Sequence, residues 1–193
     1  MPDPVWTQSY NFAQTPEGNG FTRTLYNSPV ITLTTGGSPA NRNVNVNSTN
    51  GDAVFLTSAV PSLDSGVGAT AEFQVAVTGA AEGDAGVELT FLDRAVLVQV
   101  YPNKIVTSIC NDLIGNQEQT FPTASNGTDT LIRVTFDATK NLRVYRSGTL
   151  VAGPLSTANC VKSFQRVLWW AESGAIATFK IFRYYIGGAV VPG

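Results

Sequence analysis

The pattern that most constrains this chain is a period-two alternation of apolar and polar side chains, repeated between short turns. In "DTLIRVTFDATKNLRVYRSGTLVAG", residues 129–153, the apolar residues Ile132, Val134 and Phe136 alternate with polar ones. Side chains that alternate in this way fall on opposite faces of an extended strand. The break at 137–141 is rich in residues that favour turns, and the alternation resumes after it. The segment therefore predicts three short strands joined by tight turns, with one buried face.

The same pattern extends along the chain. Gly and Pro punctuate the sequence every ten to fifteen residues, and β-branched and aromatic residues fill the intervals, which is typical of an all-β sandwich or barrel. We expect strands at 5–12, 21–26, 29–34, 43–47, 53–58, 70–78, 86–92, 95–101, 104–109, 117–121, 130–136, 141–146, 149–153, 165–171 and 176–186. So many strands in one chain predict an all-β fold of two stacked antiparallel sheets.

We expect one domain. A chain of 193 residues is long enough for a single β-sandwich domain, 1–193, with a substantial core. The stretch "GGSPANRNVNVNSTNGD", 36–52, is polar, and only Val44 and Val46 alternate as apolar residues. It predicts a surface loop or an edge strand.

Composition excludes several partners. Charged residues make up 13% of the chain, about half the usual share. The net charge of −2 gives no reason to expect binding to nucleic acid or to an anionic membrane. No apolar stretch is long enough for membrane insertion as a helix, and the start "MPDPVWTQSY" lacks the features of a signal peptide. We expect an extracellular or virion-associated protein, either a mature fragment given a start Met or a particle protein released by lysis.

The chain has no His, which excludes Ser-His-Asp and Cys-His chemistry and zinc sites built on His. Its two cysteines, Cys110 and Cys160, do not have metal-ligand spacing. They are candidates for one structural disulfide, and two buried free thiols are the alternative.

Two segments resemble a known superfamily. "IRVTFDATKNLRVYRSGTLVAGP" is similar to a hairpin of laminin-G-like and concanavalin A-like domains, and "VLWWAESGAIATFKIFRYYIG" is similar to their closing strands. The resemblance implies a jelly-roll sandwich with one concave sheet. It also implies that an opening strand bearing Trp6 and Tyr10 pairs with the last strand. Members of the superfamily include lectins, receptor-binding domains, glucanases, polysaccharide lyases and virus-particle modules.

The glucanase branch places its acid and its nucleophile on one face of one strand. The nearest pattern here is Glu82, Asp84 and Glu88 in "AAEGDAGVEL". We expect Glu82 and Asp84 in a Gly-flanked turn and only Glu88 inside a strand, which is a poor match. We therefore expect no catalytic residue.

The lyase branch would need Tyr101 together with Arg94 or Arg133, because the chain lacks His. The resemblance also implies calcium as a possible ligand, since lectin-like members often hold this ion with loop oxygens. Asn111-Asp112 and 126–129 are usable oxygen clusters, but short loops of this kind are more often simple turns. We expect no metal and no cofactor.

Aromatic residues are the better signal for binding, because an exposed Trp or Tyr stacks on the apolar face of a sugar ring. Trp169 and Trp170 are adjacent, so one should face the core and the other a sheet surface. The candidate ligand-binding residues are Trp170, Glu172, Tyr101, Gln99, Arg133 and Tyr145. The alternative is that a loop or a neighbouring subunit covers the outward Trp.

Three functions remain open. The first is a non-catalytic binding module that recognises a glycan or a cell-surface partner through the concave sheet face and its loops. The second is a structural virion protein, such as a phage capsid decoration, fibre or tail-associated domain, assembled as a homo-oligomer or on a capsid lattice. The third is a glycoside hydrolase of the glucanase type.

Overall fold

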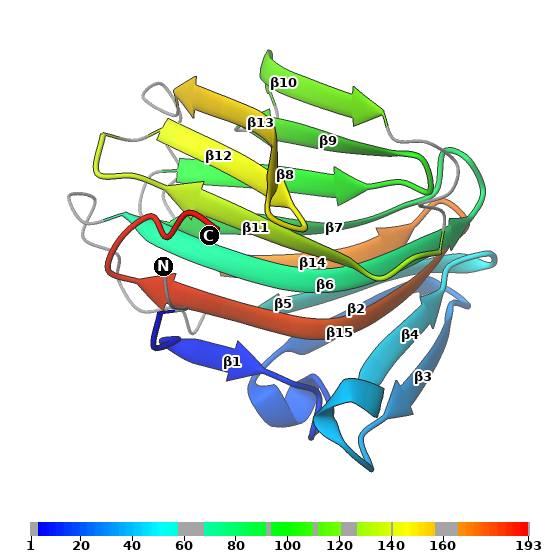
Figure 1. The fold of residues 1–193 in the computed structure, drawn as a ribbon. Coiled ribbons are helices and arrows are strands. Elements are labelled where there is room, and N and C mark those ends of the chain that lie inside the picture. The colour runs from blue at the N-terminus through cyan, green and yellow to red at the C-terminus, as the bar shows by residue number, and fades with distance from the viewer. Residues whose placement is uncertain are drawn as a thin grey trace.

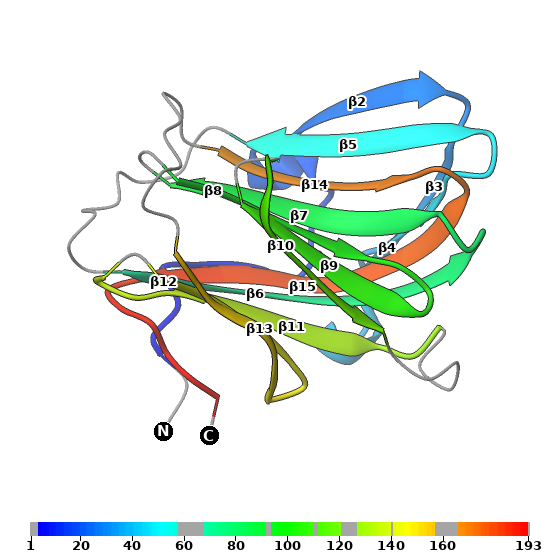
Figure 2. The same cartoon turned by 90° about the horizontal axis from the view of Figure 1, so that it is seen from above.

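The chain folds into two antiparallel β-sheets that pack face to face, so the predicted two-sheet sandwich is confirmed in this computed structural model (Figure 1). The structure describes residues 4–57, 68–91, 94–109, 112–120, 127–139, 141–156 and 166–192. Sheet A has the order β13-β12-β11-β6-β15-β4-β3, and β1 also pairs with β15. Sheet B has the order β10-β9-β8-β7-β14-β5-β2. Figure 2 shows the two layers from above.

The strands of sheet A are β1 (Gln8–Tyr10), β3 (Val30–Thr34), β4 (Asn43–Asn47), β6 (Ala69–Gly79), β11 (Thr130–Phe136), β12 (Asn141–Arg146), β13 (Thr149–Ser156) and β15 (Ala175–Ile186). The strands of sheet B are β2 (Thr22–Asn27), β5 (Gly51–Thr57), β7 (Asp84–Phe91), β8 (Arg94–Val100), β9 (Lys104–Ile109), β10 (Asp112–Thr120) and β14 (Arg166–Glu172). Two three-residue 3₁₀ turns, η1 (Glu17–Asn19) and η2 (Pro39–Asn41), connect strands. Within the described residues no helix is long and apolar enough to cross a membrane.

The core lies between the sheets and is built by the period-two alternation. Phe73 and Val134 face inward from sheet A, and Val87 and Val98 face inward from sheet B. Trp169 lies among these side chains and stacks on Phe55, with ring centroids 3.9 Å apart. Burying each such side chain contributes about 1.5–3 kcal/mol. The core is therefore the main source of stability.

The ribbon at 129–153 forms the meander predicted for it, with β11, β12 and β13 adjacent in sheet A. Asp137 fixes the first turn. Its Oδ1 accepts hydrogen bonds from the backbone N–H groups of Thr139 and Asn141, at 3.0 and 2.9 Å. Its Oδ2 accepts from Nη1 of Arg143 at 2.9 Å. The turn is thus held by one carboxylate.

The opening strand pairs with the last strand, as the resemblance implies: Tyr10 of β1 lies opposite Phe182 of β15. The stretch 36–52, expected to be a loop or an edge strand, is divided. Residues 36–42 form a loop with η2, but β4 lies between β3 and β15 and is not an edge. Val44 and Val46 explain the difference, because both are fully buried in the core. Two apolar residues are enough to hold this Asn-rich strand inside the sheet.

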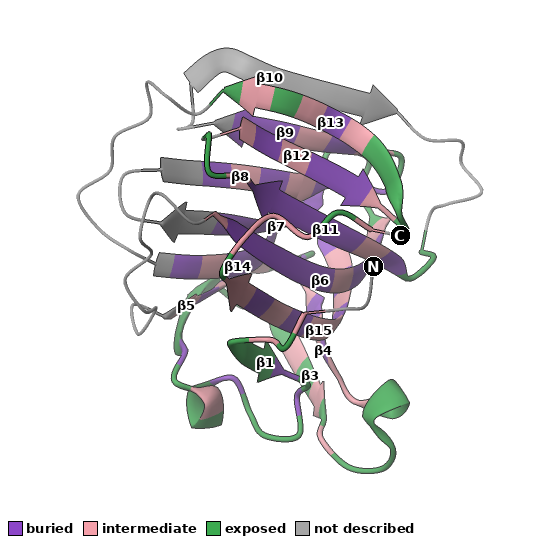
Figure 3. Ribbon diagram, turned by 60° about the vertical axis from the view of Figure 1, so that its left-hand side comes forward, coloured by how far each residue is buried: buried purple, intermediate pink, exposed green. Residues whose placement is uncertain are grey.

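Both ends of the chain cover the outer face of sheet A, where they lie side by side (Figures 1 and 2). After β15 the chain turns back across the sheet, where Thr70 donates a hydrogen bond to the carbonyl of Gly188 and accepts one from the N–H of Val190, at 2.9 and 2.8 Å. Figure 3 shows that β11 and the first half of β6 are buried almost without alternation, as segments covered on both faces must be.

Candidate functional site

The outer face of sheet B carries a shallow hollow of about 520 Å³. It extends across strands β2, β5, β14, β7, β8 and β9. Its lining combines apolar, aromatic, amide and carboxylate side chains: Tyr26, Val54, Glu88, Leu97, Gln99, Ser108, Leu168, Trp170 and Glu172. A hollow of this size with a few convergent polar groups is the usual form of a ligand site.

Three carboxylates stand in one row at an end of this hollow. Glu172 of β14 lies opposite Asp84 of β7, and the pairing of Ala171 with Ala53 places Asp52 of β5 on its other side. Tyr26 of β2 continues the row, opposite Asp52. The cross-strand register therefore joins side chains that are far apart in the sequence.

Asp84 is the centre of a hydrogen-bond network. Its Oδ2 accepts from Nε1 of Trp170 at 3.1 Å and from Nε2 of Gln99 at 3.3 Å. Nε2 of Gln99 also donates to the hydroxyl of Tyr101 at 3.3 Å. The network fixes the orientation of the amide and the indole before any ligand arrives.

Gly86 makes room for this arrangement. A Cβ added at Gly86 would lie 2.4 Å from Cζ2 of Trp170, so the indole lies directly over the backbone of β7. Only glycine allows so close an approach. The Trp170 side chain consequently lies against the sheet and does not stand out from it.

A hydrogen bond joins the carboxyl groups of Glu172 and Asp84. Burial raises the pKa of Glu172 to about 7, and the negative charges of Asp84 and Asp52 add to the rise. Burial also raises the pKa of Asp84, although hydrogen bonds from Gln99, Trp170 and Glu172 oppose it. In this hydrogen bond, the protonated carboxyl group of Glu172 is the donor and the carboxylate of Asp84 is the acceptor. The acidic row therefore changes its charge near neutral pH.

The predicted division of the two adjacent tryptophans is confirmed, since Trp169 is in the core and Trp170 faces the hollow. Trp170 is nevertheless only 5% exposed. Tyr26, at 55%, is the exposed aromatic side chain of the hollow, and sequence reasoning missed it. The sequence does show Tyr26 as an aromatic residue at the end of an expected strand. Its position beside the acidic row, however, depends on the register of β2 with β5.

The six candidate ligand-binding residues divide between the two outer faces. Trp170, Glu172 and Gln99 line the hollow, and Tyr101 is linked to them through Gln99. Arg133 and Tyr145 lie on sheet A, on the far side of the sandwich, and both are buried. The structure thus brings four of the candidates together and separates the other two.

Arg133 belongs to a buried ionic cluster on sheet A. Glu72, which is completely buried, accepts hydrogen bonds from Nε of Arg133 at 2.8 Å and from Nε of Arg183 at 2.7 Å. The ring of Trp6 lies over both guanidinium groups, with its centroid 4.2 Å from Cζ of Arg183. This cluster ties the N-terminal segment to the sheet and is covered by it.

Of the three carboxylates that were compared with the glucanase pattern, Asp84 lies in a different element from the one expected. Asp84 is the first residue of β7 and shares the outer face of sheet B with Glu88; it is not part of the turn. The paired backbone of β14 draws Asp84 into the strand, whereas Glu82 remains in the exposed turn. Asp84 and Glu88 are four residues apart, so their Cα atoms are separated by roughly 13 Å.

The remaining sequence candidates are only partly described. Cys110 and Cys160, Asn111 and the residue Asn126 lie outside the described residues, as does the side chain of Asp112. In the second oxygen cluster, the carboxylate of Asp129 contacts the ammonium group of Lys180. That carboxylate already has a cationic partner within the protein.

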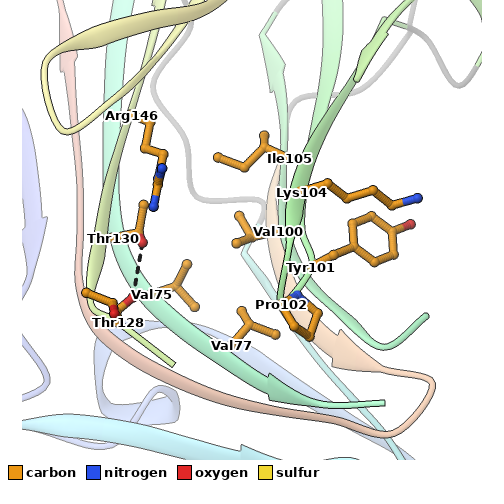
Figure 4. Close-up of a pocket in the computed structure, with 10 residues that line it drawn as sticks. All are labelled: Val75, Val77, Val100, Tyr101, Pro102, Lys104, Ile105, Thr128, Thr130 and Arg146. Carbon is orange, nitrogen blue, oxygen red and sulfur yellow. Dashed lines mark hydrogen bonds between the residues drawn. The ribbon is translucent and has the colours of Figure 1, made fainter. Parts of the chain in front are cut away.

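A second cavity opens between the sheets at one end of the sandwich (Figure 4). It is lined mainly by apolar side chains such as Val75, Val100 and Ile105, and its volume is about 10 Å³. That volume is about the size needed for one water molecule. The hollow on sheet B is therefore the better candidate for a ligand site.

No protein-family model matches this sequence, and no curated protein matches it. Solved structures match the fold. The binding domain of botulinum neurotoxin DC in complex with rat synaptotagmin II is 9% identical and has a TM-score of 0.63, over 90% of this chain and 45% of that chain. The binding domain of botulinum neurotoxin DC in complex with SialylT is 9% identical with a TM-score of 0.62, over 88% and 44%.

A carbohydrate esterase from the Shiga toxin-encoding bacteriophage phi24B matches along nearly its full length. It is 11% identical with a TM-score of 0.62, over 95% of this chain and 99% of that chain. The chain spans less than half the length of the neurotoxin domains that it matches. At such low identities these matches show the fold alone, an all-β sandwich shared with receptor-binding domains.

Proposed function

We propose that this chain is a non-catalytic binding module that recognises a glycan or a cell-surface partner through the hollow on sheet B. The observation that carries the proposal is the exposed ring of Tyr26 beside a row of preorganised polar groups. Sugar rings have an apolar face that stacks on aromatic side chains, and their hydroxyl groups need fixed hydrogen-bond partners. The hollow offers both kinds of contact.

The polar groups of the hollow are held in place before binding. Gln99 and Trp170 are both fixed by Asp84, at 3.3 and 3.1 Å. Preorganised groups lose less conformational entropy on binding, and so more of the contact energy contributes to affinity. Val54, which lies opposite Trp170 on β5, and Leu168 of β14 add apolar surface to the hollow. This combination favours a polar ligand with an apolar face.

The arrangement of the carboxylates supports a binding role more than hydrolysis. Glycoside hydrolases hold two carboxyl groups either about 5 Å or about 6.5–9.5 Å apart. Here Glu172 is hydrogen-bonded directly to Asp84, and Glu88 lies roughly 13 Å along the strand from Asp84. Neither spacing suits a pair of acid and nucleophile, so the glucanase-type alternative is the least favoured.

The matched structures support the same interpretation at the level of the fold. Two of them are binding domains in complexes with rat synaptotagmin II and with SialylT, and they share this sandwich. We assign the finer family, the concanavalin A-like and laminin-G-like jelly rolls, from the sequence resemblance together with this fold. A module of this kind would act extracellularly or on a virion.

A screen of printed glycans with purified protein tests the proposal. Tyr26→Ala should weaken binding by about tenfold or more, because it removes the exposed stacking surface. Tyr26→Phe keeps the ring and should retain most of the affinity. Leu150→Ala is a matched control, since Leu150 is similarly exposed, at 46%, but lies on sheet A. Glycan binding that is unaffected by Tyr26→Ala would reject the hollow as the binding site, and binding to no glycan would reject a glycan as its ligand.

The alternative is a structural virion protein, such as a phage capsid decoration, fibre or tail-associated domain. It is supported by the match with a bacteriophage protein over 95% of this chain and 99% of that one. A stable homo-oligomer in native mass spectrometry, or decoration of a capsid lattice, would favour this alternative. A monomer that binds glycans would favour the first proposal.

A further inference from the structure

The charged side chains that line the hollow are carboxylates. Among the described side chains, Glu88 and Glu172 line it directly, and no Lys or Arg does. Asp52 and Asp84 stand beside Glu172 on the adjacent strands. A ligand in the hollow therefore meets negative charge from three strands of sheet B.

Lys104 and Arg23 are the cations of sheet B whose side chains the structure describes, and both lie outside the hollow. Nζ of Lys104 lies over the ring of Tyr101, 4.8 Å from its centroid, and outside the hollow. Arg23 of β2 lies opposite the core residue Phe55, on the other face of the strand from Tyr26, and forms an ion pair with Glu17, with Nε and Oε1 2.9 Å apart. Neither of them contributes to the lining.

Hydrogen-bond chemistry points in the same direction as charge. Carboxylates only accept hydrogen bonds. Ligand hydroxyl groups and ammonium groups donate hydrogen bonds to them. A ligand carboxylate or sulfate would instead place like charges together, and this repulsion greatly lowers the affinity for the ligand. When Glu172 is protonated, its O–H donates to Asp84 and is not available to an incoming anion.

Resting on the proposed glycan-binding function, we propose that the hollow on sheet B selects saccharides without negative charge. Neutral sugars and amino sugars bind through hydroxyl and ammonium donors to Glu88 and Glu172, and acidic sugars are rejected. Sialylated glycans, whose sialic acid carries a carboxylate, are thus not the expected ligand class here.

A glycan array that pairs each neutral glycan with its sialylated or uronic-acid counterpart, and with amino-sugar glycans, tests this inference. At about 0.02 M salt the acidic member of each pair should bind at least about tenfold more weakly than the neutral member. At about 0.5 M salt the difference should shrink to about threefold or less, because salt screens the repulsion.

Glu88→Gln should raise the relative binding of acidic glycans by about two- to fivefold, since it keeps the shape of the side chain and removes one charge. Glu82→Gln is the matched control: it removes the same charge from the exposed turn outside the hollow and should change nothing. Acidic glycans that bind as well as their neutral partners would overturn the inference and leave the proposed function intact. If no glycan of any class binds, both fail.

Discussion

Replacing Glu172 by Gln should remove a pH dependence from the stability of the fold. Folding raises the pKa of Glu172 from 4.5 to about 7, through burial and the nearby charges of Asp84 and Asp52. Between these two values the unfolded chain has lost the proton and the folded chain retains it. The stabilising effect is complete below about pH 4.5, and it is lost as the pH rises through about 7.

The size of the effect follows from the shift. A change of this size in pKa would correspond to roughly 3 kcal/mol if the group were fully shielded from solvent. Glu172 is only half-buried, so screening by water reduces the expected contribution to about 1–2 kcal/mol. The amide side chain introduced by Glu172→Gln cannot ionise, and its N–H replaces the proton that Glu172 donates to Asp84.

The measurement is urea unfolding followed by tryptophan fluorescence, near pH 5 and near pH 8. At the lower pH the two proteins should be equally stable within about 0.5 kcal/mol, and at the higher pH Glu172→Gln should be the more stable by about 1–2 kcal/mol. Glu82→Gln, in the exposed turn, should follow the wild type at both values. An equal pH slope in wild type and Glu172→Gln would refute the reasoning, as would a less stable variant at the higher pH.

Three further changes have defined outcomes. Glu72→Gln should lower the unfolding free energy by about 3 kcal/mol in urea unfolding, because it leaves the buried guanidinium of Arg133 and the partly exposed one of Arg183 without their carboxylate; a loss below about 1 kcal/mol would contradict this. Gly86→Ala should displace the indole of Trp170, because a Cβ would lie 2.4 Å from the ring. We expect a red shift of the tryptophan fluorescence and a fall of more than about 1 kcal/mol in the unfolding free energy. An unchanged emission spectrum would contradict this prediction. Desolvation alone would raise the pKa of Asp137, but hydrogen bonds from Thr139, Asn141 and Arg143 outweigh it and lower this pKa to about 2. Asp137→Ala should therefore cost about 1 kcal/mol near neutral pH, and thermal melts should show this cost disappear as the pH falls from 3.8 towards about 2.

The strands were the most predictable part of the fold, because period-two alternation is a local property of the sequence. The strands expected at 130–136 and 141–146 are β11 and β12 with the same bounds. The first strand was expected at 5–12 but spans only Gln8–Tyr10. The difference has a physical cause: Trp6 stacks on Arg183 across the sheet surface, so the segment before β1 packs on a face and does not extend the strand.

The candidate site was predictable only in part. Alternation alone separates Trp169 from Trp170 and places Glu172 with Trp170. It does not say which sheet a strand joins, so Arg133 was grouped with residues that lie on the other side of the molecule. The pairing of Asp84 with Glu172 depends on the register of β7 with β14, and no local pattern encodes it. Non-local register is thus what sequence reasoning lacked.

The position of the two chain ends has a practical consequence. Both ends lie together on the sheet A side of the sandwich (Figure 2). The hollow lies on the outer face of sheet B, the opposite side. A biotin tag or a sensor-chip linker attached at either end would therefore leave the hollow facing the solution. Coupling many copies to a bead through one end would present the hollows outward together, so that weak individual contacts with a glycan-coated surface would add up to strong attachment.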